Sequence, residues 1–154
     1  MDFRELNQHI DAFTADSDVC AEKLREWSQQ GTNVAVLDLA KAYLQIRIHD
    51  SLWPYQTVIF KGRRYCLSRL GFGLNVALLI MKAVIHCVLS QDSDVKEGSS
   101  AYIDDILVNE DIVKATCVEA HLRNFGLTSK PHERVADGAR VLGLRVLKEG
   151  ESLV

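Results

Sequence analysis

The sequence predicts an α+β fold built on an antiparallel sheet with helices packed on one face. Residues 33–37 and 101–108 are short segments rich in β-forming apolar residues, as buried strands are. Residues 18–30 and 75–89 have the length and apolar content of helices. Strands follow one another through hairpins rather than through repeated strand–helix–strand units, and this order favours antiparallel pairing.

Composition is typical of one globular domain. The chain has 154 residues, of which 47% are apolar and 25% charged, enough to bury a substantial core. The longest apolar run, residues 76–81, is far shorter than the roughly 20 residues that span a membrane, and the N-terminus has no signal-peptide pattern. We therefore expect an intracellular protein, cytoplasmic and/or nuclear, without a membrane partner. The four cysteines form no C-x-x-C pair and are predicted to be buried free thiols.

The first elements are a helix and two strands. Residues 18–30 follow good capping residues and precede Gly31, so they are predicted to form an amphipathic helix. The apolar segment 33–37 predicts a buried strand that stops at Asp38. Alternating apolar residues predict a second, half-exposed strand over 44–48.

A hairpin and a helix follow. Residues 55–60 and 64–68 stand on either side of the turn 61–63, a pattern that predicts a β-hairpin. The apolar stretch 75–89 predicts a largely buried helix, and the polar residues 91–100 predict a loop.

The octet 101–108 is apolar on both sides of two adjacent aspartates. Because aspartate is depleted in strand interiors but common in turns, we expect a tight hairpin with Asp104 and Asp105 at its tip. Residues 111–124 then predict a helix, and residues 140–147 a last strand.

The net charge of −3 hides an uneven distribution. Residues 39–82 carry seven Lys and Arg against Asp50 alone, a net charge of +6, and both flanking segments are acidic. Such asymmetry is typical of a polyanion-binding face, although a solvated basic hairpin explains it equally well. The positive side chains of the predicted hairpin region are Lys61, Arg63, Arg64 and Arg69.

Three carboxylates stand at strand ends. Asp38 ends one predicted strand, and Asp104 and Asp105 cap a hairpin, so pairing of the two strands would gather three negative charges. Carboxylates bind Mg²⁺, which keeps water or substrate phosphates at its remaining positions, and two such ions stabilise in-line phosphoryl transfer. An ordinary solvated turn, with Asp38 as a helix N-cap, explains the same residues without a metal.

Several segments resemble reverse transcriptases, in the order in which that family has them. Tyr102-Ile103-Asp104-Asp105 resembles the YxDD box. Residues 38–43 (DLAKAY) resemble the first palm motif, D-x-x-x-A-[YF], and residues 2–7 (DFRELN) are similar to a segment of the retroviral fingers.

The other matches lie further along the chain. Residues 70–77 (LGFGLNVA) are similar to the LPFGLxxAP motif of long-terminal-repeat retrotransposons, 125–128 (FGLT) to the fourth motif, and 141–144 (VLGL) to the primer grip. The resemblance implies the polymerase palm of a retrotransposon or retrovirus-like pol polyprotein. Residues 1–30 would end the fingers and residues 31–154 would run from the palm through the primer grip, with thumb, connection and RNase H absent.

The resemblance also assigns catalytic and metal-binding roles. Asp38, Asp104 and Asp105 would be the catalytic carboxylates and metal ligands, and the backbone of Leu39 would be a further metal contact. The family's fourth motif carries a Lys several residues after its Gly, whereas Lys130 comes early, so the general acid is Lys130 or none.

Substrate contacts follow in the same way. Tyr43 would be the steric gate under the sugar, although a core aromatic explains it without the motif. Tyr102 would lie against the primer strand, and the basic hairpin towards the template or primer backbone. The nucleotide pocket would include Phe72 and Gly73, and the primer grip Leu142 and Gly143.

The implied reaction is attack of a primer 3′-hydroxyl on the α-phosphate of an incoming dNTP. An RNA or DNA template directs it, and two Mg²⁺ ions, or Mn²⁺ in their place, assist it. Because thumb and RNase H would lie in the rest of the pol polyprotein, we expect this chain alone to be inactive.

Two departures from the family pattern bear on one loop. Gly71 and Leu78 stand where the family usually has proline, which predicts a looser loop.

A non-catalytic retroelement remnant with weak nucleic-acid binding is the alternative function. A phosphoacceptor receiver domain also gathers acidic residues, but it needs alternating strand–helix units and a parallel sheet.

Overall fold

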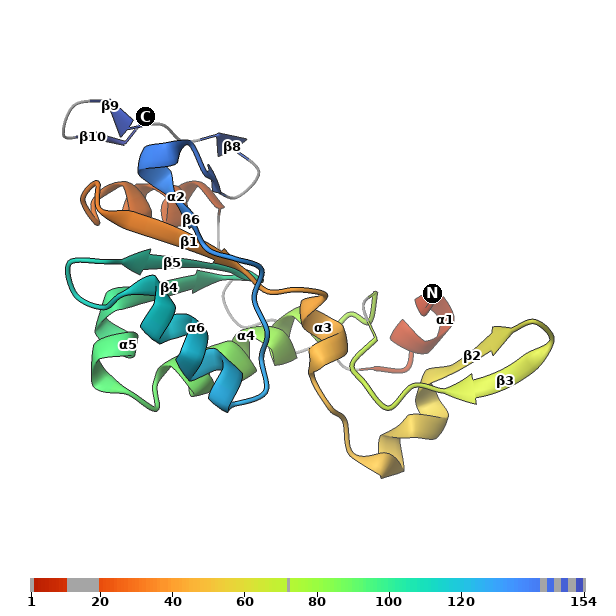
Figure 1. Cartoon of the computed structure of the whole chain (residues 1–154). Coiled ribbons are helices and arrows are strands. Elements are labelled where there is room, and N and C mark those ends of the chain that lie inside the picture. The colour runs from red at the N-terminus through yellow and green to blue at the C-terminus, as the bar shows by residue number, and fades with distance from the viewer. Residues whose placement is uncertain are drawn as a thin grey trace. The chain divides into compact units, whose positions relative to one another are not determined.

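The computed structural model describes residues 2–10, 20–71, 73–141, 144–145, 148–149 and 152–153 (Figure 1). Contacts divide the chain into two compact units. Unit 1 comprises Met1–Ala15 and Lys41–Met81, and unit 2 comprises Asp16–Ala40 and Lys82–Val154.

Unit 2 is built on a four-stranded antiparallel sheet (Figure 1). The strand order is β4-β5-β1-β6, and every neighbouring pair is antiparallel. The predicted α+β class and antiparallel sheet are therefore confirmed, as is the buried strand that ends at Asp38. The strands are β1 (Val34–Asp38), β4 (Ser99–Tyr102), β5 (Asp105–Asn109) and β6 (Glu133–Arg134).

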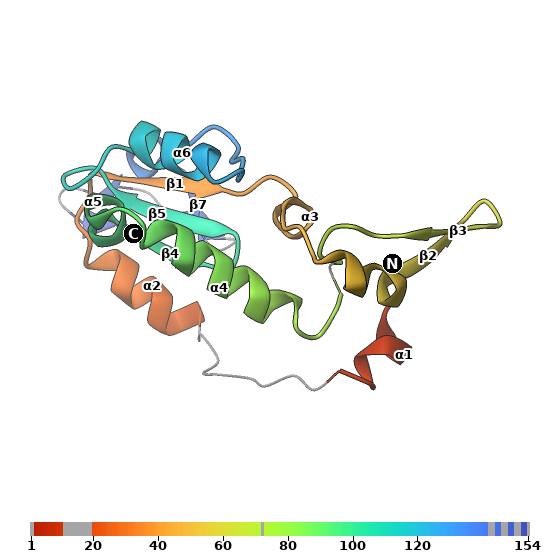
Figure 2. The same cartoon turned by 90° about the horizontal axis from the view of Figure 1, so that it is seen from below.

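Both faces of this sheet are buried. Val34, Val36 and Leu107 share one face and pack with Trp27 of α2 (Cys20–Ser28). Because side chains alternate along a strand, the residues between them point to the other face, where α6 (Ala115–Asn124) contacts β1 and β5. Figures 1 and 2 show α2 and α6 on opposite sides of the sheet. Helices therefore cover both faces of the sheet, whereas the sequence predicts helices on one face. The fully buried residues of the second face are Ala35, Leu37, Ile106 and Val108.

Two predictions about helices are wrong. Helix α4 (Ala77–Leu89) is not largely buried: Met81 and Ile85 are buried on one side, whereas Leu78 and Leu79 are exposed on the other. The segment predicted as a loop contains α5 (Ser93–Gly98). Its start is stabilised by Asp92, whose Oδ1 accepts hydrogen bonds from two backbone N–H groups of the first turn, at 2.9 and 3.0 Å.

The C-terminal segment forms hairpins instead of the single strand predicted over 140–147. Strand β7 (Arg140–Val141) pairs antiparallel with β8 (Leu144–Arg145), so the chain reverses direction within the expected strand. A further antiparallel pair is β9 (Lys148–Glu149) with β10 (Ser152–Leu153).

Unit 1 contains short helices in place of the strand predicted over 44–48. After α1 (Arg4–Asn7), α3 (Ala42–Gln45) follows Lys41, which has a left-handed backbone with φ 49°. Local hydrogen bonds, Leu44 N–H to the Lys41 carbonyl and Ile46 N–H to the Tyr43 carbonyl, close this turn. The strand prediction is therefore wrong: residues 42–45 are helical, and within the predicted strand Arg47 forms an isolated bridge with Arg69.

The predicted β-hairpin is confirmed. After the 3₁₀ helix η1 (Asp50–Gln56), β2 (Thr57–Phe60) pairs antiparallel with β3 (Arg63–Cys66). Phe60 lies opposite Arg63, so the turn has two residues, Lys61 with φ 49° and Gly62 with φ 75°. Positive φ at both positions is typical of a type I′ turn, the turn that matches the twist of a hairpin.

Gly71 forms a hydrogen bond in the loop that is predicted to be looser than in the family pattern. Its backbone N–H donates a 2.8 Å hydrogen bond to Oε1 of Gln56, whose side chain is only 3% exposed. The Gln56 Nε2 in turn donates to the carbonyl of Arg69 at 2.9 Å. Proline has no N–H and could not make the first of these bonds.

Replacing Gly71 with alanine is expected to lower the free energy of unfolding by about 1–3 kcal/mol. The added Cβ would lie 2.7 Å from Cε2 of Phe3 and 2.9 Å from Oε1 of Gln56. Urea denaturation followed by circular dichroism measures the loss. In a double-mutant cycle, Phe3→Leu should reduce it by giving the methyl group room. Equal stability of Gly71→Ala and the natural chain would contradict the tight packing.

The structure also bears on the predictions about the cysteines and about membrane spans. Cys66, Cys87 and Cys117 are exposed free thiols, so the prediction that they are buried is wrong. All three lie on exposed sides of a strand or helix, where sequence spacing alone carries no burial signal. Within the described residues, no helix is both long and apolar enough to cross a membrane.

Candidate functional site

Asp38 and Asp105 lie side by side on the sheet. The two residues are direct partners in the register of β1 and β5. The next pair along the two chains, Leu39 and Asp104, is joined by a 3.0 Å hydrogen bond from the Leu39 N–H to the Asp104 carbonyl. Asp38 and Asp105 therefore form the non-hydrogen-bonded kind of antiparallel pair, in which side chains on one face approach most closely. Both side chains are half-buried.

This pair extends into a row across four segments. Tyr102 of β4 is the partner of Asp105, and its ring packs against the cluster around Trp27, on the same face. On the other side of Asp38, the backbone of Lys130 donates a 2.8 Å hydrogen bond to the Asp38 carbonyl. We call Tyr102, Asp105, Asp38 and Lys130 the carboxylate row.

Lys130 forms an ion pair with Asp38. Its Nζ lies 2.5 Å from Oδ2 of Asp38. This hydrogen bond and the charge of Asp38 raise the pKa of Lys130, and the charges of Asp104 and Asp105 add to the shift. The negative charges of three carboxylates, those of Asp38, Asp104 and Asp105, therefore stabilise the Lys130 ammonium group. Because the side chains of Lys130 and Asp38 are 61% and 39% exposed, the pair contributes little to stability.

A bulge beside β1 determines where Lys130 lies. Val36 is opposite Glu133 and Leu39 is opposite Ser129, so one more residue stands on the second segment than on β1 between these pairs. Pro131, which has no N–H to donate, lies within this bulge.

Glu119 of α6 takes the place of the missing ladder partner. Its Oε1 accepts a 3.0 Å hydrogen bond from the His132 backbone N–H and lies 2.8 Å from His132 Nδ1. The helix thereby fixes the segment that carries Lys130. Sequence reasoning missed Glu119, and no motif in the sequence indicates it.

The hairpin turn differs by one residue from the prediction. Tyr102 pairs with Asp105, so the two turn residues are Ile103 and Asp104, and Asp105 begins β5. The prediction that both aspartates form the tip is wrong in this respect. Ile103 has φ 57°, a conformation that is rare and strained for a β-branched residue. With positive φ at the first turn position only, the turn resembles type II′, which favours glycine there.

Donor chemistry at the row fits a divalent cation. Asp38 and Asp105 offer neighbouring carboxylate oxygens, and the Lys130 ammonium shows that the site accepts positive charge. Among the described residues, no three His, Cys, Asp or Glu side chains form a group that could hold a metal. Mg²⁺ needs no such cage, because it binds through one or two carboxylates and completes its shell with water or phosphate oxygens.

The remaining predicted site residues lie outside unit 2 or outside the described residues. Tyr43 is a half-buried residue of α3 in unit 1. Gly73, with φ 93°, accepts a 2.9 Å hydrogen bond from the Asn7 side chain through its carbonyl. Phe72, Leu142 and Gly143 lie outside the residues that the structure describes.

The predicted basic residues divide into two kinds. Lys61, Arg63 and Arg64 lie exposed at the end of the β2–β3 hairpin. Arg69 is half-buried and donates a 3.0 Å hydrogen bond from its guanidinium to the carbonyl of Gln45. Arg69 is therefore tied by a hydrogen bond to the end of α3.

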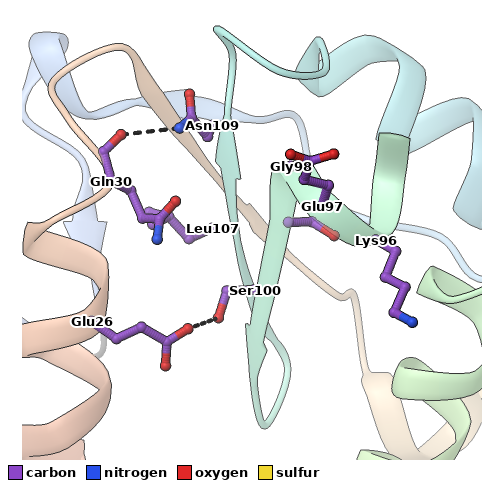
Figure 3. A pocket seen from close by; sticks show the side chains of 9 residues that line it. Glu26, Gln30, Lys96, Glu97, Gly98, Ser100, Leu107 and Asn109 are labelled. Atoms are coloured by element: carbon purple, nitrogen blue, oxygen red, sulfur yellow. Dashed lines mark hydrogen bonds between the residues drawn. The ribbon is translucent and has the colours of Figure 1, made fainter. Parts of the chain in front are cut away.

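A shallow pocket of about 240 Å³ lies near the far end of β5 from the aspartates (Figure 3). Hydrogen bonds join several of its polar groups to their neighbours. The Ser100 hydroxyl donates to Glu26 Oε1 at 3.0 Å and accepts from the Trp27 indole at 2.9 Å. Asn109 donates to the carbonyl of Gln30. These bonds tie α2 to β4 and β5, so the pocket is part of the sheet packing and includes none of the carboxylate row.

Comparison with known proteins identifies solved structures that have a similar fold. No family model and no curated protein matches the chain. The crystal structure of the prototype foamy virus protease-reverse transcriptase matches 98% of it with a TM-score of 0.70 at 20% identity. The foamy viral enzyme in complex with an RNA/DNA hybrid matches 99% with a TM-score of 0.78 at 17% identity. The chain has a reverse-transcriptase-like fold.

A third solved structure agrees. A selenomethionine-labelled mutant of the prototype foamy virus enzyme matches 98% of the chain with a TM-score of 0.77 at 23% identity. Each match covers 21% of the foamy virus chain, so the protein spans about a fifth of the length of these enzymes. At these identities the similarity is one of fold.

Proposed function

We propose that the chain is the catalytic core of an RNA-directed DNA polymerase, the palm of a reverse transcriptase. The observation that carries the proposal is the carboxylate pair, Asp38 beside Asp105, at the end of an antiparallel sheet in a fold that matches reverse transcriptases. The reaction class is transfer of a nucleotide from a dNTP to a primer 3′-hydroxyl, directed by a template strand.

Asp38 and Asp105 would hold divalent ions in this proposal, with Asp104 and the Leu39 carbonyl as further ligands. When bound, Mg²⁺ or Mn²⁺ would neutralise the phosphate charge that develops during phosphoryl transfer. The protein contributes the position of the carboxylates, which the ladder between β1 and β5 fixes. Tyr102 would lie beside the metal ligands, where an aromatic ring can contact the primer end.

The remaining partners complete the proposal. Tyr43, Phe72 and Gly73 would contact the incoming nucleotide, and Leu142 and Gly143 the primer, as the resemblance implies. The pol polyprotein would supply the surfaces that enclose the template–primer duplex. The solved foamy viral enzyme is bound to an RNA/DNA hybrid, which supports a nucleic-acid partner of this kind.

Calorimetric titration of the 154-residue chain with Mn²⁺, and then with dTTP, tests the proposal. We expect Mn²⁺ to bind, and dTTP to bind only when Mn²⁺ is present, because its phosphates complete the coordination shell. The variant with both Asp38→Asn and Asp105→Asn should bind neither. If the natural chain binds neither, the chain is instead a non-catalytic remnant that keeps the fold.

Replacing Lys130 with methionine is expected to tighten Mn²⁺ binding about two- to fivefold. The Lys130 ammonium contacts the carboxylate that the metal needs, so the two cations compete for Asp38. Methionine keeps the length of the side chain and removes its charge. Electron paramagnetic resonance of free Mn²⁺ measures the affinity, with Lys96→Met on α5 as the control for a general loss of positive charge. Weaker binding by Lys130→Met would show that Lys130 assists the metal.

A further inference from the structure

The β2–β3 hairpin exposes both of its faces. Seven of its eight strand residues are exposed, and Val58 is half-buried. Ile59 is 71% exposed, Phe60 61% and Tyr65 48%. Large apolar side chains rarely gather on a ribbon whose two faces are both exposed, so this ribbon is a candidate binding surface.

The register divides the hairpin into two chemically different faces. Val58 is opposite Tyr65 and Phe60 is opposite Arg63, so these four side chains share one face, the aromatic face. Thr57, Ile59, Arg64 and Cys66 share the other, which has no aromatic ring. The aromatic face therefore places two rings and a guanidinium side by side.

Phe60 and Tyr65 are diagonal neighbours on the aromatic face, and such neighbours lie about 7–8 Å apart. This spacing allows each ring to contact a different base of one extended strand. The Lys61 Nζ lies 5.4 Å from the centroid of the Phe60 ring, so a cation already contacts a face of that ring.

The charge of the hairpin favours a polyanion. Lys61, Arg63 and Arg64 lie within four positions at its end, and the hairpin strands contain no acidic residue. Among the ion pairs between described residues, none involves these three side chains. Aromatic rings flanked by unpaired positive charge are the surface that single-stranded nucleic acids bind, through base stacking and phosphate contacts.

We infer that the aromatic face of the β2–β3 hairpin binds single-stranded RNA or DNA, with Phe60 and Tyr65 stacking on bases and Arg63 contacting the phosphates. A duplex hides the faces of its bases, so the hairpin would select an unpaired strand. The inference deepens the proposed function by naming the unpaired template strand as the ligand. It depends on residues of unit 1 that take no part in the carboxylate row.

Fluorescence anisotropy of a labelled 20-nucleotide RNA of mixed sequence, titrated with the full chain, tests this inference. We expect Phe60→Ala and Tyr65→Ala each to raise the Kd about fivefold or more, the usual effect of losing one stacked base. Ile59→Ala removes an even more exposed apolar side chain from the opposite face of the same strand, and it should leave the Kd within about twofold.

Arg63→Ala and Arg64→Ala form a second matched pair. Both should reduce the salt dependence of binding, because each removes one positive charge. Arg63→Ala should raise the Kd more, because only Arg63 shares the aromatic face. All these side chains are exposed, so circular dichroism spectra should remain unchanged.

Three results would overturn the inference. One is equal weakening by Phe60→Ala and Ile59→Ala, and another is equal affinity for the RNA and its duplex. The third is binding to anionic phospholipid vesicles in the absence of RNA binding, which would identify the hairpin as a lipid-binding surface. None of these results would change the expected Mn²⁺ binding by the carboxylate row, so the proposed function would stand or fall separately.

Discussion

Asp105→Asn is expected to weaken Mn²⁺ binding by about tenfold or more. Asparagine has the shape of aspartate, so β5 and its pairing with β1 should survive. The substitution removes one of the two charges that face each other across the strand pair, and neutral amide oxygens bind hard cations less strongly. Paramagnetic resonance of free Mn²⁺, or calorimetry, gives the dissociation constant.

Asp94→Asn provides the matched control. Asp94 is an exposed aspartate in the first turn of α5, and its replacement changes the net charge by the same amount. Its Mn²⁺ affinity should equal that of the natural chain. If both variants lose affinity equally, the metal binds by diffuse attraction to an acidic protein, and the carboxylate row is not its site.

Asp38→Asn needs a companion variant, because Asp38 has two partners. Its loss removes a ligand and also releases the Lys130 ammonium beside Asp105. Asp38→Asn should therefore weaken Mn²⁺ binding more than Asp105→Asn does. Adding Lys130→Met should recover the part that is due to the released ammonium group.

The sequence indicated which carboxylates could form the candidate site, but not how they are arranged. Asp38 and the Asp104–Asp105 pair follow from apolar segments that end in carboxylates, a local signal. Their position relative to Lys130 depends on the register between β1 and the segment after Gly126, which contains a bulge at Pro131 and is bound by Glu119 of α6. Register between distant segments leaves no local pattern, so the ion pair could not be predicted.

The same distinction explains the fold. The buried strand β1 was predictable because four successive apolar residues fit a strand buried on both faces. Helix α5 was not predictable, because a single buried apolar residue, Val95, gives no helical pattern. Its other signal in the sequence is the capping residue Asp92. The hydrogen bond of Gly71 could not be predicted either, because its partner, Gln56, is fifteen residues away and contacts it only in the folded chain.

Leu37→Ala is expected to lower the free energy of unfolding by about 2–5 kcal/mol. Leu37 is completely buried at the centre of β1, on the face that α6 covers. Alanine leaves a cavity, and the pairing of Leu37 with Ile106 of β5 limits how far the backbone of β1 can move to close it. Domains of this size are stable by about 5–15 kcal/mol, so the loss is a large part of the total.

Leu78→Ala and Leu37→Met make this prediction specific. Leu78 is 47% exposed, so the same deletion there should cost well under 1 kcal/mol. Methionine at 37 nearly conserves volume and should cost about 1 kcal/mol. Leu37 adjoins Asp38 in sequence but points to the opposite face of the sheet. Molecules of Leu37→Ala that remain folded should therefore bind Mn²⁺ with natural affinity. A weaker intrinsic affinity in the folded fraction would show that the core packing beneath β1 also adjusts the position of the Asp38 carboxylate.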